Sequence, residues 1–128
     1  MPFCTAINCM DGQTQLPVDE YLRNLLGAEY VDTITEAGPV RILAEAPDSD
    51  AARSILDRVN ISVKKHGSEC IGIVAHHNCA GNPATETGQK EQLDLAVRFV
   101  AAQHPSVRVL GLWVDSGRQV TQVCSAWD

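Results

Sequence analysis

The fold is decided by one stretch of the sequence, Ile71-Gly-Ile-Val-Ala-His76-His-Asn-Cys79-Ala-Gly81. It begins as a continuous apolar run, which is typical of a buried β-strand. It ends in His76 and, three residues later, in Cys79, and the glycine and Asn82-Pro83 that follow favour a turn. The stretch therefore predicts a buried strand whose C-terminal end presents an imidazole and a thiol, two side chains that bind metals.

A second stretch has the same character. Residues 3–9 form an apolar run that ends in Cys9, and Asp11 follows two residues later. If the two strands are neighbours in a sheet, Cys9 and Asp11 lie beside His76 and Cys79, although they are far apart in the sequence. Two thiolates, one imidazole and a carboxylate or a water suit tetrahedral Zn²⁺. Asp11 has an alternative role, because next to Gly12 it also suits the cap of a turn.

The rest of the chain alternates between strand and helix patterns, which predicts an α/β fold with a mainly parallel sheet and helices on both faces. Residues 40–46 suit either a short helix or an extended segment, and residues 119–123 suit an antiparallel edge strand. With strands 1 and 3 as central neighbours the order is 2-1-3-4, and ligands bind where strand order reverses. The other expected elements are a helix from Pro17 to Gly27, a strand at 29–35, a helix from Ser49 to Gly67, a strand at 69–76, a helix at 86–103 and a strand at 107–114.

Length and composition limit the classes of function. The 128 residues predict a single domain, 1–128, and the net charge of −6 argues against a nucleic-acid or anionic-membrane partner. Apolar runs are too short for a membrane span, and we see no signal peptide. The five cysteines are an odd number and lack the spacing of a disulfide framework. We therefore expect a cytoplasmic protein in which they are metal ligands or core residues.

The paired motifs resemble those of the β-class carbonic anhydrases. Cys9-x-Asp11 is similar to that family's Cys-x-Asp-x-Arg after the first strand, and His76-x-x-Cys79 is similar to its His-x-x-Cys after the third. Ala37-Gly38-Pro39 resembles the family's Ala-Gly-Asn. Residues 110–117 resemble its closing Gly-x-x-Tyr-Asp-x-x-Thr-Gly. The resemblance extends from residue 4 to 123 and indicates a short, divergent member.

The resemblance implies the family's fold, Zn²⁺ as the cofactor and a lyase of the carbonate dehydratase type. Zinc-bound hydroxide would attack CO₂ in a small apolar pocket and give bicarbonate. Related linear molecules such as COS or CS₂ need the same hydroxide, and the sequence does not separate these substrates.

The main departure from the family pattern is Gln13, which stands where the motif has arginine. In the family, the aspartate–arginine pair holds the carboxylate off the zinc. Glutamine carries no charge, so we predict that Asp11 is the fourth zinc ligand, beside Cys9, His76 and Cys79. We also predict that Asp11 and Gln13 together control catalysis.

An alternative function follows from the same departure. A closed Cys₂HisAsp zinc site would stabilise a non-catalytic domain that serves in binding or regulation. In either case we expect a homodimer, because the helix at 86–103 has two apolar faces and the sheet has an open edge.

Overall fold

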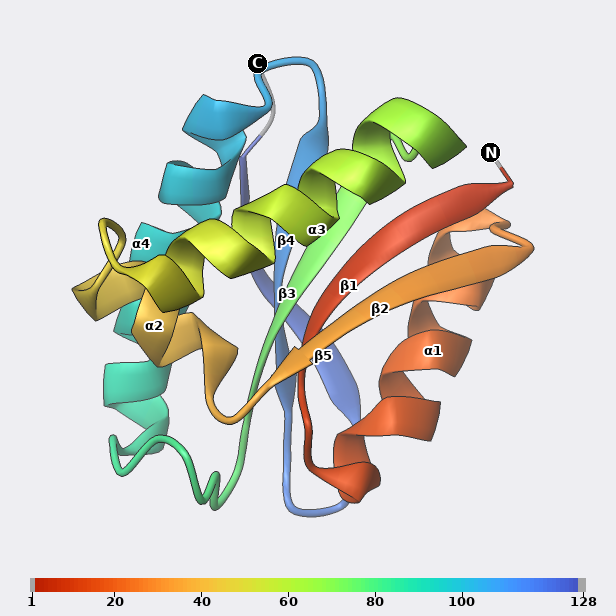
Figure 1. The fold of residues 1–128 in the computed structure, drawn as a ribbon. Coiled ribbons are helices and arrows are strands. Elements are labelled where there is room, and N and C mark those ends of the chain that lie inside the picture. The colour runs from red at the N-terminus through yellow and green to blue at the C-terminus, as the bar shows by residue number, and fades with distance from the viewer. Residues whose placement is uncertain (1, 127–128) are drawn as a thin grey trace.

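The computed structural model describes residues 2–126, which form one five-stranded sheet with helices packed on both of its faces (Figure 1). In chain order the elements are β1 (Phe3–Cys9), α1 (Gly12–Leu26), β2 (Tyr30–Glu36), α2 (Pro39–Glu45), α3 (Asp50–His66), β3 (Cys70–His76), α4 (Glu86–Gln103), β4 (Arg108–Val114) and β5 (Val120–Ala126). The α/β class is thus confirmed, and residues 40–46, which the sequence left open, belong mostly to a helix.

The strand order is β2-β1-β3-β4-β5, with β5 antiparallel to β4 and all other pairs parallel. The predicted order is confirmed, and the reversal falls between β1 and β3 as expected. Ile7 pairs with Ile73 across these two central strands. The C-terminal ends of β1 and β3 therefore lie at the same edge of the sheet, in the lower part of Figure 1.

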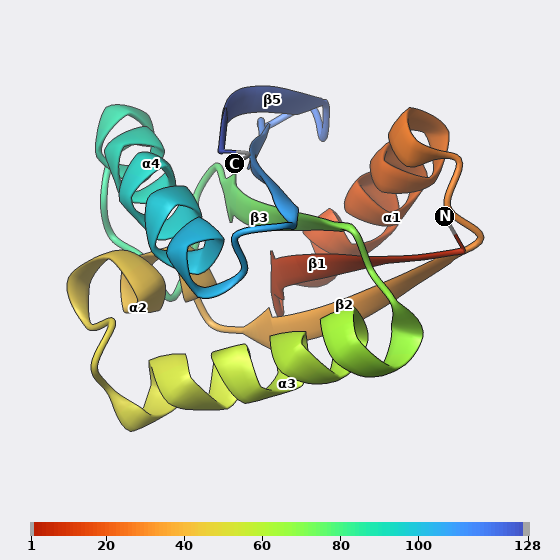
Figure 2. The same ribbon diagram turned by 90° about the horizontal axis from the view of Figure 1, so that it is seen from above.

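Helices cover the two faces unequally. Figure 2 shows α1 on one face and α2, α3 and α4 on the other. On the α1 face, Val18 and Leu22 pack on strand residues such as Val74. The larger core on the opposite face includes Ile55 from α3 and Leu93 from α4. Apolar side chains alternate between the two layers along β1 and β3, as expected for strands buried on both faces.

Helix α1 begins five residues earlier than the sequence predicts. We expected its start at Pro17, but it begins at Gly12 and Pro17 lies inside it. The reason is the Asp11 side chain, which caps the helix by accepting the Gln13 N–H at 2.8 Å. Pro17 is the sixth residue of the helix, so it removes the hydrogen bond that an N–H at this position would donate to the Gln13 carbonyl.

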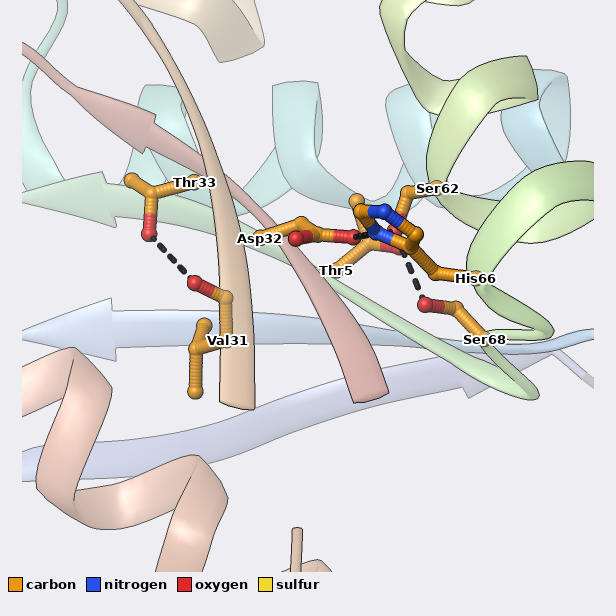
Figure 3. A network of polar contacts seen from close by, with 7 residues as sticks. All are labelled: Thr5, Val31, Asp32, Thr33, Ser62, His66 and Ser68. Carbon is orange, nitrogen blue, oxygen red and sulfur yellow. Dashed lines mark hydrogen bonds and ion pairs between the residues drawn. The ribbon is translucent and has the colours of Figure 1, made fainter. Parts of the chain in front are cut away.

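A partly buried polar cluster joins β1, β2 and α3 away from the C-terminal strand ends (Figure 3). Ser62 lies at its centre, 2.7 Å from both the Thr5 hydroxyl and an Asp32 carboxylate oxygen and 2.8 Å from the Ser68 hydroxyl. His66 contacts the same Asp32 oxygen at 2.6 Å. This cluster satisfies polar groups beneath α3 and fixes that helix against the sheet.

No helix within residues 2–126 is long and apolar enough to cross a lipid bilayer.

Candidate metal centre

Three potential metal ligands meet where β1 and β3 end. Cys9 is the last residue of β1, His76 is the last residue of β3, and Cys79 lies in the turn that follows. Their ligand atoms all lie within 4.8 Å of one another, and the three residues are buried. Within residues 2–126 this is the one cluster of three or more such residues. The parallel pairing of β1 with β3 brings these side chains together.

The distances fit a tetrahedral zinc ion. The two sulfur atoms of Cys9 and Cys79 lie 3.8 Å apart. Two Zn–S bonds of about 2.3 Å at the tetrahedral angle also place the sulfur atoms about 3.8 Å apart. The same geometry needs about 3.6 Å between sulfur and a ligating histidine nitrogen, which is within the span of this cluster.

The His76 ring is oriented as a metal-binding histidine requires. Its Nδ1 lies 2.9 Å from the His77 carbonyl oxygen and can only donate to it, so Nε2 is left with its lone pair. Nε2 is buried and has no hydrogen-bond partner among residues 2–126. An unpartnered buried nitrogen costs free energy, and a metal ion at the two thiols would remove that cost.

Neighbouring side chains hold the backbone of the ligand residues. Gln89, a buried residue of α4, donates from Nε2 to the His76 carbonyl at 3.0 Å. Gln15 of α1 donates from Nε2 to the Cys9 carbonyl at 2.6 Å. Each ligand-bearing strand end is therefore tied to the helix on one face of the sheet.

The surroundings of Cys79 disfavour its ionisation. Burial raises the pKa of the Cys79 thiol, and the nearby Cys9 raises that pKa further. The backbone N–H groups of Gly81 and Asn82 act in the opposite direction, because they favour a thiolate. Two thiolates this close repel each other unless a cation lies between them, so this pair is suited to a dication.

The loop that carries Cys79 packs directly against the loop after β2. A Cβ atom built on Gly38 would lie 2.7 Å from the Gly81 carbonyl oxygen, and one on Gly81 would lie 2.5 Å from the Ala37 carbonyl carbon. Gly38 also has φ of 65°, the left-handed region that favours glycine. Only glycine fits at these two positions, which explains Ala37-Gly38 and Gly81 in the sequence.

Asp11 does not belong to the cluster of three ligand atoms. Its Oδ1 accepts the Gln13 backbone N–H, so the capping role is the one the structure shows. The Gln13 side chain lines cavities on the α1 side of the site. The predicted roles of Asp11 on zinc and of Gln13 in catalysis remain predictions.

Two cavities lie next to the site on its α1 side. The smaller, about 80 Å³, is lined by Val114 and by eight polar residues: Gln13, Thr14, His76, His77, Asn78, Asp115, Ser116 and Arg118. We expected a small apolar pocket, so its polar lining is a departure from the sequence-based expectation. The larger, about 750 Å³, is an open groove between α1 and the turn after β4, and it shares Gln13 and Arg118 with the smaller one.

Sequence reasoning missed three residues around the site: Gln15, Gln89 and Arg118. Gln89 carried a usable signal, because it stands in line with the apolar stripe of α4 at helical spacing from Leu93 and is buried like it. Arg118 carried none, since a charged residue in a turn is usually solvated.

The chain matches one protein family over residues 1–124, a family described as "Putative carbonic anhydrase". The chain belongs to this family. The resemblance to carbonic anhydrases, first seen in the Cys9 and His76-x-x-Cys79 motifs, is thus confirmed. It covers nearly the whole chain. No curated protein is significantly similar to it in sequence.

Solved carbonic anhydrases share the fold. A β-carbonic anhydrase of Sordaria macrospora, from a study of two tetrameric enzymes, is 11% identical with a TM-score of 0.63, over 98% of this chain and 82% of that one. A carbonic anhydrase of Glaciozyma antarctica is 15% identical with a TM-score of 0.62, over 94% and 81%. The β-carbonic anhydrase CafA of Aspergillus fumigatus is 15% identical with a TM-score of 0.54, over 95% and 74%.

Proposed function

We propose that this protein is a zinc-dependent carbonic anhydrase that catalyses the reversible hydration of CO₂ to bicarbonate. One observation carries the proposal: three buried ligand atoms converge at the strand reversal, with a sulfur–sulfur distance that fits zinc and an unpartnered His76 Nε2. Membership of the carbonic anhydrase family supports the reaction. We place the protein in the cytoplasm, because its five cysteines are free.

Cys9, His76 and Cys79 would hold the zinc ion, and His77 and Gln89 would keep the His76 ring and backbone in place. When bound, zinc acidifies a water and supplies a nucleophile near neutral pH. The two thiols are buried, so bulk water has little access to the ligand cluster. Polar groups in the adjoining cavity would receive the charged product.

We further propose Asp11 as the fourth ligand of the resting protein. The cap uses one carboxylate oxygen, Oδ1, and the second oxygen has no hydrogen bond to a residue of the described chain. Gln13 offers Asp11 its backbone N–H, a neutral donor and therefore a weaker partner than a guanidinium. In this proposal the metal ion competes with the helix cap for the Asp11 carboxylate.

The alternative function is a closed Cys₂HisAsp zinc site in a non-catalytic domain. It is favoured by the uncharged Gln13 and by the polar lining of the small cavity, which offers an apolar molecule little surface. This alternative predicts bound zinc without turnover of CO₂, COS or CS₂.

Metal analysis and stopped-flow kinetics together test the proposal. We expect about one zinc per chain in protein purified without chelator, and CO₂ hydration that is lost when zinc is removed and regained when it is restored. Cys79→Ser should lose most of the zinc and the activity. Cys124→Ser is the matched control, because Cys124 lies on β5 outside the ligand cluster.

Two results would contradict the proposal. A folded protein that is free of metal and cannot be loaded would exclude the zinc centre. Fully zinc-loaded protein without CO₂ hydration between pH 6 and pH 10 would favour the closed site instead.

A further inference from the structure

The lining of the small cavity beside His76 includes one arginine that the proposed reaction has not used. Arg118 lines this cavity together with Gln13, Asn78 and Ser116, and it also lines the open groove outside. A residue that borders both spaces stands where a molecule would enter. The cavity also reaches His76, so anything bound in it lies next to the candidate metal centre.

The turn that carries Arg118 has a defined conformation. Asp115 Oδ1 accepts the backbone N–H groups of Gly117 and Gln119, both at 2.9 Å. The Asp115 carbonyl accepts the Arg118 N–H at 3.0 Å. Arg118 itself has φ of 63°, in the left-handed region that favours glycine. The hydrogen bonds of Asp115 hold this backbone, so the position of the arginine is set by the fold.

The Arg118 guanidinium differs from those of most other arginines of the protein. Five of them form ion pairs with carboxylates, at Arg23, Arg41, Arg53, Arg58 and Arg98. No such pair involves Arg118 within the part of the chain that the structure describes. Its five N–H donors are therefore available to a ligand.

We propose that this cavity is a binding site for a small planar oxyanion, and that Arg118 is the residue that selects for it. In the proposed reaction, on which this assignment of the anion rests, the ligand is bicarbonate. A guanidinium binds a planar oxyanion through two parallel hydrogen bonds. The amides of Gln13 and Asn78 and the Ser116 hydroxyl supply further donors.

Charge and size agree with such a ligand. The volume of about 80 Å³ accommodates a few heavy atoms, as in bicarbonate or nitrate. Val114 is the single apolar lining residue, so the cavity favours an anion over CO₂. Asp115 is the one lining carboxylate, and its Oδ1 already accepts two backbone N–H groups, which offset part of its charge.

Nitrate is a suitable probe, because it is planar, has one negative charge and does not react. We would measure its dissociation constant from the rise in the unfolding midpoint at constant ionic strength, with and without bound zinc. Arg118→Gln should weaken nitrate binding about tenfold or more, as expected when a charged hydrogen-bond donor is lost. Arg118→Lys should retain an intermediate affinity. Arg98→Gln is the control, since it removes the same charge from the exposed surface of α4.

Kinetics give a second readout. In zinc-loaded Arg118→Gln the KM for bicarbonate dehydration should rise about tenfold. Unchanged nitrate binding in Arg118→Gln would overturn the inference, and so would an equal loss in Arg98→Gln.

The two proposals fail in different ways. If the protein hydrates CO₂ but Arg118→Gln leaves nitrate binding and the bicarbonate KM unchanged, the inference alone is wrong. If nitrate binding depends on Arg118 but the zinc-loaded protein has no activity, the anion site stands and the proposed reaction is wrong.

Discussion

A single hydrogen bond decides what His76 can do. Because Nδ1 lies against the His77 carbonyl, the neutral ring carries its proton there and offers Nε2 as a ligand. At the same strand end, Gln89 donates a hydrogen bond to the His76 backbone carbonyl, so both the ring and the backbone of His76 are held in place. Preorganisation of this kind lowers the entropy cost of metal binding, since few side-chain rotamers remain to be lost.

At position 13 the chain departs from the β-class motif that it resembles, and this gives a direct test. We expect Gln13→Arg to raise CO₂ hydration near pH 7 about tenfold, because a charge-assisted pair holds the Asp11 carboxylate better than a neutral donor does. Stopped-flow assays of zinc-loaded protein measure this. Asn24→Arg is the control, because it adds the same charge at an exposed position of the same helix. An equal gain in both variants, or no gain in Gln13→Arg, would contradict the role given to position 13.

Single residues differ in how far the sequence predicts them. Cys9, His76 and Cys79 follow from ligand chemistry at strand ends, and the fold brings them together. Capping by Asp11 was one of two roles that the sequence left open. Gln15 and Arg118 were not predicted, because their contacts depend on the angle of α1 and on the turn after β4, which hydrophobic patterning does not define.

At the level of elements, the site depends on two loops that approach through glycine. The loop after β2 contacts the loop after β3 at Gly38 and Gly81, so the backbone that carries Cys79 is supported from a neighbouring strand. The sequence indicated this loop through its similarity to a family motif. It did not indicate that Gly81 is the other half of the contact, since the two loops lie more than 40 residues apart and meet only through strand pairing.

A pair of glycine substitutions separates backbone strain from this contact. Gly27 and Gly38 both have φ near 65°, but only Gly38 has neighbours where a Cβ would lie. Gly27→Ala should lower the free energy of unfolding by about 1–2 kcal/mol. Gly38→Ala should cost about 1–3 kcal/mol more, because the loop must move. It should also weaken zinc binding, which Gly27→Ala should not.

Denaturant unfolding and zinc titration of the two variants provide the measurements. Equal losses of stability, or equal zinc affinities, would show that the contact between the loops does not position Cys79.

For the molecule as a whole, strand order was predictable and assembly was not. Consecutive strands that are linked by a helix run parallel to each other. The metal ligands at the ends of two apolar runs predict that β1 lies beside β3. Which surfaces meet another chain depends on how much apolar area is left after folding. The accessible surface of 6408 Å² is close to the roughly 6,600 Å² typical of a monomer of this mass. This total does not indicate which surface meets another chain.

The predicted second apolar face of α4 is only partly covered. Phe99 packs against the core next to β5, but Leu95 is 54% exposed. We therefore expect a homodimer, with twice the 13.8 kDa chain mass by light scattering at micromolar concentration. Leu95→Glu should shift the mass to that of the monomer, because it buries a charge in the interface. Ile61→Glu, at an equally exposed site on α3, should remain dimeric. A monomeric parent protein, or dissociation by both substitutions, would exclude α4 as the interface.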